Sequence, residues 1–319
     1  MTAEPAAPLL SVLIPAHDAA RFLAECLSSV LTQQRRFELE VIVVDDASND
    51  ASAAIARGFE RKFECVRLVR LETNQGPAAA RNAGIAQARG ELIAFLDADD
   101  LWPAGSLEAR VDALQRQPAA ALVFGDCRQF DERGPRARTL FEEGGFGAAA
   151  WGGEALVPNG YARLLDDNFI TTGSVVARRA ALTRAGGFAE DLRLVEDLDL
   201  WLRMARHAPI VWCARECLRR RRHDANISAD AESIALAFLE VLRRHVADWQ
   251  SGEAAALGVD AKRLAAREWL HLADLARLRG DAATAWRRLW RSVTTHAAPS
   301  TQWRAGKTAL KLLAGWKSR

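Results

Sequence analysis

Four short apolar runs, separated by stretches with helical periodicity, constrain the fold of this 319-residue chain most strongly. The last run, L-I-A-F-L, has no polar interruption, which is typical of a strand buried on both faces. The strands are predicted over residues 9–14, 40–44, 66–71 and 92–96, and the intervening helices over about residues 19–32, 51–63 and 78–88. Strands that alternate with amphipathic helices predict a mostly parallel sheet with right-handed crossovers. We therefore expect an α/β domain.

Composition excludes several classes of protein. The net charge of +2 gives no global argument for binding nucleic acid. No apolar run approaches the roughly 18 residues of a membrane span, and the N-terminus lacks a basic region followed by an apolar one. We therefore expect a cytoplasmic protein. The five cysteines are scattered and odd in number, which favours reduced thiols.

Polar residues follow three of the predicted strands at the point where the chain leaves the sheet. In open parallel sheets, ligands bind at the carboxyl ends of the strands, so we expect these segments to share one crevice. The segments are Pro15-Ala16-His17-Asp18, Asp45-Asp46 and Asp97-Ala98-Asp99-Asp100.

The third segment places three carboxylates within four positions. Such carboxylates repel one another unless a cation is present, and Mg²⁺ or Mn²⁺ is the obvious candidate. Asp97 and Asp99 should point to one side of the chain and Asp100 to the other. The alternative is a solvated turn that caps a helix beginning near Pro103.

The ligand predicted from these charges is a metal-bound nucleoside diphosphate. A divalent metal offsets the charge of a diphosphate, while Asp45 or Asp46 can accept hydrogen bonds from a base N–H or a ribose hydroxyl. The chain has no G-x-x-x-x-G-K-[ST] and no G-x-G-x-x-G after the first strand. This absence argues against a P-loop or dinucleotide fold.

Five ordered motifs resemble those of the family-two glycosyltransferases of the GT-A fold, over roughly residues 9–228. They are S-V-L-I-P-A-H-D, V-V-D-D-A-S-N-D, N-Q-G-P-A-A-A-R-N-A-G, F-L-D-A-D-D and G-G-F-A-E-D-L-R-L-V-E-D-L-D-L-W-L-R. The resemblance implies a Rossmann-like GT-A sheet and an inverting transfer from a nucleotide diphosphate sugar. By family habit the nucleotide would be UDP.

The resemblance also implies roles for individual residues. Asp97 and Asp99 would form the D-x-D pair, and Asp99, with Asp97 and His223, would hold the metal. Asp197 would be the catalytic base, with Glu196 beside it. The donor would be bound by Pro15, Ala16, His17, Asp45, Asp46, Asn74, Gly76, Arg81, Asp97, Ala98 and Asp99. One departure is that His17 and Asp18 stand where many relatives have Tyr-Asn.

Each assignment has a structural alternative. Asp45 and Asp46 could cap the next helix, for which Ser48 and Asn49 are also candidate caps. Arg81 could be a surface residue paired with Glu72 or Asp97. The remaining alternatives are that the acids at 196, 197 and 199 line the positive end of a helix, and that His223 belongs to a basic loop.

The middle of the chain gives weaker signals. A strand is predicted over residues 120–124, and the aperiodic residues 130–153 are expected to form a long loop over the site or a poorly ordered segment. Residues 170–178 predict a strand on the acceptor side. Thr171, Thr172 and Ser174 are its candidate contacts to acceptor hydroxyls.

The predicted organisation is a glycosyltransferase domain over residues 1–230 and a helical subdomain over 231–319. The nucleotide-binding half would cover about 9–100 and the acceptor half about 101–230. Helices are predicted over 232–249, 261–279 and 282–293.

The segment after Asp281 contains eight basic residues and no acidic one. On a helical wheel its basic and apolar residues separate, as in an interfacial helix on an anionic membrane. The alternative is a surface helix of the enzyme itself. The basic face holds Arg304, Lys307 and Lys311, and the apolar face Leu310, Leu313 and Trp316.

The predicted function is that of a metal-dependent, inverting glycosyltransferase. It would use Mn²⁺ or Mg²⁺ and a glycan or lipid-linked acceptor in surface polysaccharide synthesis, at the inner face of the cell membrane. A sugar nucleotidyltransferase and a non-catalytic carbohydrate-binding or scaffold relative are the alternatives. Against the first alternative, this chain lacks the Gly-rich basic loop that sugar nucleotidyltransferases have after the first strand. Against the second, the chain retains four site aspartates.

Overall fold

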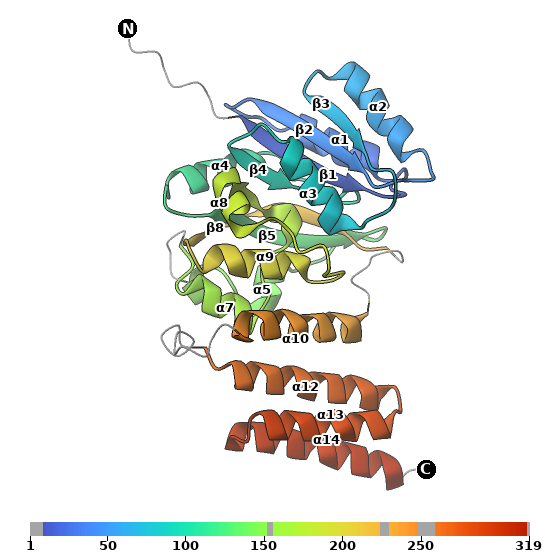
Figure 1. Cartoon of the computed structure of the whole chain (residues 1–319), viewed down its shortest axis with the longest axis vertical. Helices are drawn as coiled ribbons and strands as arrows, with labels where there is room; N and C mark the ends of the chain where they lie inside the picture. Colours follow the sequence, from blue (N-terminus) through green and yellow to red (C-terminus); the bar gives the residue numbers. More distant parts are fainter. Residues whose placement is uncertain (1–8, 152–155, 224–229, 248–258, 318–319) are drawn as a thin grey trace. The chain divides into compact units, whose positions relative to one another are not determined.

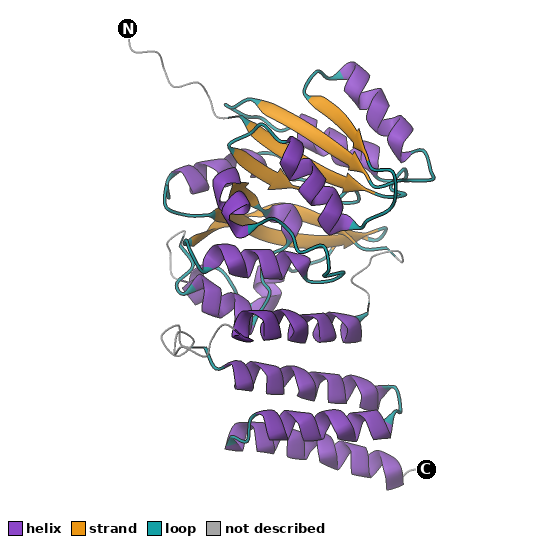
Figure 2. Cartoon of the chain, viewed as in Figure 1, coloured by secondary structure: helices purple, strands orange, loops and turns teal. Residues whose placement is uncertain are grey.

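The computed structural model describes residues 9–151, 156–223, 230–247 and 259–317 (Figure 1). The chain divides into two units, Met1–Asn226 and Ile227–Arg319. Figure 2 shows that the strands all belong to the first unit, while the described part of the second is helical.

Four parallel strands form one half of the sheet in the first unit. Their spatial order is β3-β2-β1-β4, and each neighbouring pair is parallel. The strands and the helices that connect them are β1 (Leu10–Ala16), α1 (Leu23–Leu31), β2 (Leu39–Asp45), α2 (Ser52–Lys62), β3 (Val66–Arg70), α3 (Pro77–Gln87) and β4 (Leu92–Phe95). The predicted alternation of strands and helices is thus confirmed.

Some predicted boundaries are wrong. Pro15 does not end β1, because the strand continues to Ala16, and α1 begins at Leu23 rather than near residue 19. Neither Ser48 nor Asn49 caps α2, since Asp50 accepts the backbone N–H of Ser52. The Ser48 hydroxyl is used elsewhere, as acceptor for the backbone N–H of residue 18.

The other half of the sheet mixes directions. β7 (Val176–Arg178) is antiparallel to β4 and to β5 (Leu122–Asp131), while β8 (Ile210–Arg221) is parallel to β5. The short β6 (Gly134–Pro135) pairs with the end of β5. The remaining helices of this unit are α4 (Ser106–Gln115), α5 (Leu140–Gly144), α6 (Ala148–Trp151), α7 (Gly160–Asp166), α8 (Arg179–Ala185) and α9 (Glu196–Ala205).

The predicted long loop over residues 130–153 is wrong over its described part. Thr139 and Glu142 form a capping box at the start of α5. The buried rings of Phe141 and Trp151 lie 5.4 Å apart, centroid to centroid, and both contact Phe124. This aromatic packing orders the segment. Residues 152 and 153 lie outside the described residues.

The predicted strand over residues 170–178 is also wrong in its first part. Thr172–Ser174 form a turn of 3₁₀ helix, η1, and the strand begins at Val176. The side chain of Ser174 is buried. Its hydroxyl and its backbone N–H both donate to the carbonyl of Thr171, which closes the turn.

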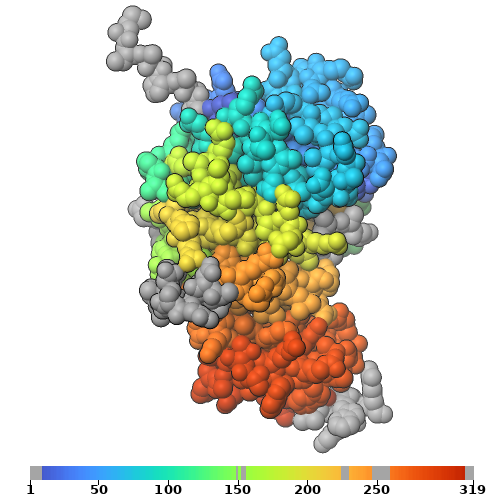
Figure 3. All heavy atoms as spheres, in the orientation of Figure 1, coloured from blue at the N-terminus to red at the C-terminus, as the bar shows by residue number. Residues whose placement is uncertain are grey.

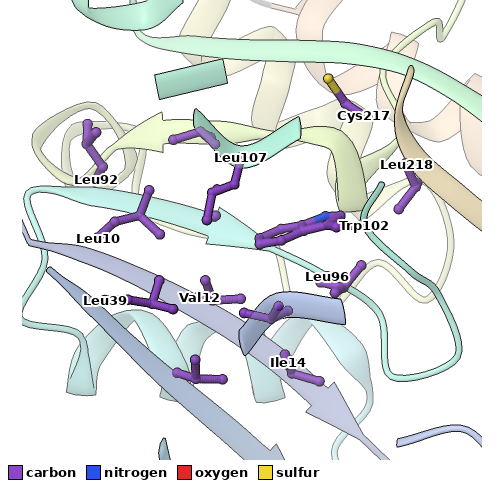
Figure 4. Packing of buried hydrophobic residues seen from close by; sticks show 14 of the residues in the cluster. Leu10, Val12, Ile14, Leu39, Leu92, Leu96, Trp102, Leu107, Cys217 and Leu218 are labelled. Atoms are coloured by element: carbon purple, nitrogen blue, oxygen red, sulfur yellow. The ribbon is translucent and has the colours of Figure 1, made fainter. Parts of the chain in front are cut away.

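The hydrophobic core of the first unit lies between the sheet and its helices. Figure 4 shows Trp102 within this core together with Leu10, Leu96 and Leu218. Each fully buried side chain of this size contributes about 1.5–3 kcal/mol relative to an exposed one. The core therefore fixes Trp102, which directly follows the D-A-D-D-L segment.

The described part of the second unit consists of α10 (Ala231–Ala247), α12 (Ala261–Leu278), α13 (Ala282–Thr295) and α14 (Pro299–Lys317). These helices match the predicted ones, apart from residues 248 and 249, which lie outside the described residues. Asp260 and Asp281 cap α12 and α13 through their side chains. None of the described helices combines the length and apolar character that crossing a bilayer requires.

Candidate functional site

The carboxyl ends of β1 and β2 are joined directly. The backbone N–H of Asp46 donates to the carbonyl of Ala16 at 2.8 Å, and Nδ1 of His17 lies 2.7 Å from the carbonyl oxygen of Asp46. β4, which carries the acidic segment, is the other neighbour of β1. The polar segments that follow these strands thus lie at one edge of the sheet, as the parallel arrangement predicts.

Asp46 holds the loop that leads into α3. Its buried carboxylate accepts the backbone N–H groups of Gln75, at 2.8 Å, and Gly76, at 2.7 Å. Gly76 has φ +88°, a conformation that favours glycine. Asn74 Nδ2 lies 2.9 Å from His17 Nε2, so this loop also contacts the end of β1.

Asp45 has an unsatisfied oxygen. One carboxylate oxygen accepts from Arg70 Nε at 2.8 Å, while the other is buried and has no hydrogen-bond partner in the described part of the chain. A buried carboxylate oxygen without a donor is costly. This observation fits a missing donor such as a base N–H or a ribose hydroxyl. Neither Asp45 nor Asp46 caps α2.

Arg81 is a buried link between two acidic segments and not a surface residue. Its side chain donates to Asp97 and to Glu196, each at 2.7 Å, and it is 5% exposed. Burial lowers its pKa, but Asp97 and Glu196 more than reverse this, so the net shift is upward. The contact with Asp97 is the one that the sequence anticipated, whereas that with Glu196 was missed.

The three carboxylates of the acidic segment point in different directions. Asp100 is buried and accepts the backbone N–H of Arg221 at 2.8 Å, while Asp99 Oδ2 lies 2.9 Å from His223 Nε2. Burial and the charge of Asp97 raise the pKa of Asp99, and burial and Asp99 raise that of Asp100. The cluster therefore holds more negative charge than its environment favours.

Asp97 and Asp99 fit a hard divalent cation by their chemistry. Mg²⁺ and Mn²⁺ prefer carboxylate ligands, and Mg²⁺ is commonly held by one or two carboxylates plus substrate phosphates. A cation would also relieve the repulsion within the acidic segment. Within the described ranges, no three His, Cys, Asp or Glu side chains converge as a ready-made metal site. Phosphate oxygens would have to complete the ligand set.

The start of α9 presents Glu196 and Asp197 differently. Glu196 is buried against Arg81, and burial and the charge of Asp197 raise its pKa while Arg81 lowers it. Asp197 is half-buried and accepts the backbone N–H of Leu198 at 2.7 Å and the hydroxyl of Thr172 at 2.8 Å. Of the two, Asp197 is the more accessible to a substrate.

The three predicted acceptor contacts differ in access. The Ser174 hydroxyl is buried and donates to the carbonyl of Thr171, which argues against its contact with an acceptor. The Thr172 hydroxyl donates a hydrogen bond to Asp197. Thr171 is half-buried and stays a prediction.

Strained backbone gathers at this edge of the sheet. Outside glycine, the described residues with positive φ are Asp18, Ala47, Asn159 and Val195. Asp18 and Ala47 follow β1 and β2, and Val195 precedes the Glu196-Asp197 pair. A β-branched residue at φ +53° costs of order 1–3 kcal/mol, and such strain clusters at functional sites. The sequence carries no signal for Ala47 or Val195.

Arg221 is a further site residue that the sequence did not single out. Its Nε donates to the carbonyl of Asp99 at 2.9 Å, in addition to the bond from its backbone to Asp100. Its guanidinium lies over the rings of Phe22 and Phe130. Within a run of four arginines, nothing in the sequence distinguishes this one.

A family model, Glycosyl transferase family 2, matches residues 11–184 of this chain. The O-antigen biosynthesis protein RfbC of Myxococcus xanthus is 30% identical over 254 residues, which are 78% of this chain and 18% of RfbC. Several curated relatives are matched over less than half of their own length.

Two solved structures show the same fold. S. aureus TarS in complex with UDP-GlcNAc has a TM-score of 0.66 and 18% identity, over 96% of this chain and 88% of that one. The mannosyltransferase PcManGT of Pyrobaculum calidifontis, in complex with GDP-Man and Mn²⁺, has a TM-score of 0.65 and 20% identity, over 98% of this chain and 83% of that one. The predicted GT-A fold is confirmed.

Proposed function

This chain belongs to glycosyl transferase family 2, and from that premise we propose that it transfers a sugar from a nucleoside diphosphate sugar to an acceptor hydroxyl. The observation that supports this most directly is the position of Arg81. Its guanidinium joins Asp97 of the D-x-D pair to Glu196, the neighbour of Asp197, at 2.7 Å on each side. Arg81 thus joins the proposed donor-binding segment to the segment that carries the candidate base.

Asp197 is the proposed base. It removes the proton of the acceptor hydroxyl as the oxygen forms the new glycosidic bond and the bond from the anomeric carbon to the diphosphate breaks. Its carboxylate is half-buried, and the two hydrogen bonds that it accepts fix its position. Inversion of the anomeric centre is carried over from the family resemblance.

The donor would lie at the ends of β1, β2 and β4. Asp45, with its unsatisfied oxygen, and His17 would meet the nucleoside, which we propose to be uridine. Asp99, with Asp97 and His223, would hold Mn²⁺ or Mg²⁺, which when bound offsets the charge of the diphosphate. Glu196 keeps Arg81 in place beside these groups.

The proposed acceptor is a glycan or lipid-linked saccharide in surface polysaccharide synthesis, at the inner face of the cell membrane. This proposal is supported by the similarity to an O-antigen biosynthesis protein. We also propose peripheral membrane contact through α14, the red helix at the end of the chain in Figures 1 and 3.

The outer face of α14 differs from the predicted one. Leu310, expected opposite the basic residues, is 67% exposed and lies on the same side as Lys307 and Lys311. Trp303 is 63% exposed, and the ammonium of Lys307 lies 3.6 Å from its ring centroid. Large apolar side chains among lysines suit the interface of an anionic bilayer. The side chains of residues 313 and 316 lie outside the described part.

Reversal of two charges on α14 tests this contact. Lys307→Glu with Lys311→Glu should reduce partitioning onto phosphatidylglycerol vesicles more than about tenfold, since each basic residue contributes about 1 kcal/mol near an anionic surface. Vesicle co-sedimentation measures the effect. A matched double reversal in the first unit, Arg61→Glu with Lys62→Glu, should bind as the wild type does. Equal binding of all proteins would contradict contact through α14, and no binding by the wild type would contradict membrane contact.

A thermal-shift panel tests the donor site. We expect one of UDP, GDP, dTDP and CMP to raise the melting temperature in the presence of Mn²⁺ or Mg²⁺, because a ligand that binds the native state stabilises it. The shift should shrink with EDTA and in Asp99→Ala. If no nucleotide stabilises the wild-type protein with either metal, the proposed donor site is wrong.

A further inference from the structure

The hydroxyl of Thr172 is the side-chain partner of the proposed base. Its Oγ1 donates to Asp197 Oδ2 at 2.8 Å, while the backbone N–H of Leu198 donates to Oδ1 at 2.7 Å. A threonine hydroxyl carries one proton, and an ionised carboxylate can only accept, so the direction of this bond is defined. Both oxygens of Asp197 are therefore placed by a donor.

Thr172 is itself fixed by the core. It begins η1 and is 5% exposed. The carbonyl of the next residue, Gly173, accepts from Trp102 Nε1 at 2.7 Å and from Arg110 Nη1 at 3.4 Å. Both donors are buried, and the guanidinium of Arg110 lies 4.3 Å from the centroid of the Trp102 ring. Two buried donors therefore hold the turn that carries the Thr172 hydroxyl.

Trp102 also connects this turn to the donor site. Trp102 follows Asp99 by three positions and Asp100 by two, so the indole that donates to Gly173 lies directly after the acidic segment. The backbone of Leu101 pairs with that of Arg219 on β8, at 3.0 and 2.8 Å. The residue after the acidic segment and the turn that carries Thr172 are therefore joined by a direct hydrogen bond.

Asp197 needs such a partner because competing charges surround it. Arg81 attracts its carboxylate, while Glu196, the adjacent residue, repels it. Arg81 already binds Asp97 and Glu196, and its charge favours a rotation of the Asp197 carboxylate toward it. The Thr172 hydroxyl opposes that rotation by holding Oδ2.

We propose that Thr172 is a positioning residue that holds the Asp197 carboxylate at the distance from the acceptor hydroxyl that proton removal requires. This inference rests on the proposed function. It replaces a donated hydrogen bond from Thr172 to the acceptor, because the single hydroxyl proton is already donated to Asp197. Thr172 itself does not touch the reacting atoms.

The test compares Thr172→Val, which keeps the shape and removes the hydroxyl, with Thr172→Ser, which keeps the hydroxyl. We expect kcat to fall about 10- to 100-fold in Thr172→Val, since a misplacement of about 1 Å can cost that much. The donor KM and the nucleotide-induced thermal shift should stay within about twofold. Thr172→Ser should recover most of the activity, and Thr183→Val, at an exposed threonine of α8, should behave as the wild type does.

The outcomes separate this inference from the proposed function. If Asp197→Asn loses turnover but Thr172→Val keeps the wild-type kcat, the positioning role is wrong and the base assignment stands. Equal losses in the Val and Ser variants, or a raised donor KM at unchanged kcat, would also overturn the positioning role. If Asp197→Asn keeps its turnover, the base assignment fails and the inference fails with it.

Discussion

Replacement of Asp197 by Asn is expected to lower kcat by about 10²- to 10⁴-fold, the usual contribution of a general base. The amide keeps the shape of the carboxylate, and its oxygen can still accept the bond from Thr172 or from the backbone of Leu198. It cannot take up the acceptor proton. Nucleotide binding should be unchanged, because the donor residues lie at the ends of other elements. Steady-state kinetics and the thermal-shift panel measure the two properties separately.

The matched control for this variant is Asp199→Asn on the same helix. Asp199 is buried and forms an ion pair with Arg203 at 2.6 Å, so its replacement should reduce stability. We expect the folded Asp199→Asn protein to keep kcat within a few-fold of the wild type. Wild-type turnover by Asp197→Asn would exclude Asp197 as the base.

Replacement of Arg81 by Met is expected to have the largest effect on stability. Removal of the guanidinium leaves Glu196 buried without its cationic partner, and breaking a buried ion pair in this way costs about 3–5 kcal/mol. Asp97 contributes less to this loss, because its side chain is 37% exposed and can be hydrated. Urea unfolding measures the loss. An exposed pair provides the control: Arg21→Met should cost about 1 kcal/mol or less, because Arg21 and its partner Glu132 are both largely in solvent.

The loss of unfolding free energy caused by Arg81→Met should depend on pH. In the native protein, burial and Asp197 raise the pKa of Glu196 above its ordinary value, and Arg81 opposes this shift. Without Arg81 the folded-state pKa rises further. A group with a raised folded-state pKa destabilises the fold when it is ionised, so the penalty should be largest at neutral pH and shrink as the pH falls through that pKa. A loss below about 1 kcal/mol at neutral pH would contradict the role of this link.

The parallel half of the sheet was predictable because β1, β2 and β4 are largely apolar and because helices separate all four strands along the chain. The half of the sheet with mixed strand directions was harder to predict. α5 and α6 are too short for a periodic signal, and the aromatic cluster that orders them joins Phe141 and Trp151 to Phe124, which lies on β5. β8 ends in a run of arginines that resembles a loop, yet the backbone of Arg219 bonds to that of Leu101.

The candidate site shows the same division. The D-x-D and E-D motifs are local, so the sequence places Asp97, Asp99 and Asp197 directly. The contact between Arg81 and Glu196 joins residues 115 positions apart, and no periodicity reports such a pair. The orientation of Ser174 and Thr172 depends on a 3₁₀ turn that the strand-like composition concealed.

The most direct test of the central claim is release of nucleoside diphosphate from a panel of UDP-, GDP- and dTDP-sugars, with Mn²⁺ and a glycan or lipid-linked acceptor extract. We predict release from donors of one base by the wild type. Release should be lost in Asp197→Asn and Asp99→Ala, while Asp199→Asn retains it. Release at the same rate in wild type and Asp197→Asn, or from no donor at all, would contradict the proposed glycosyl transfer at this site.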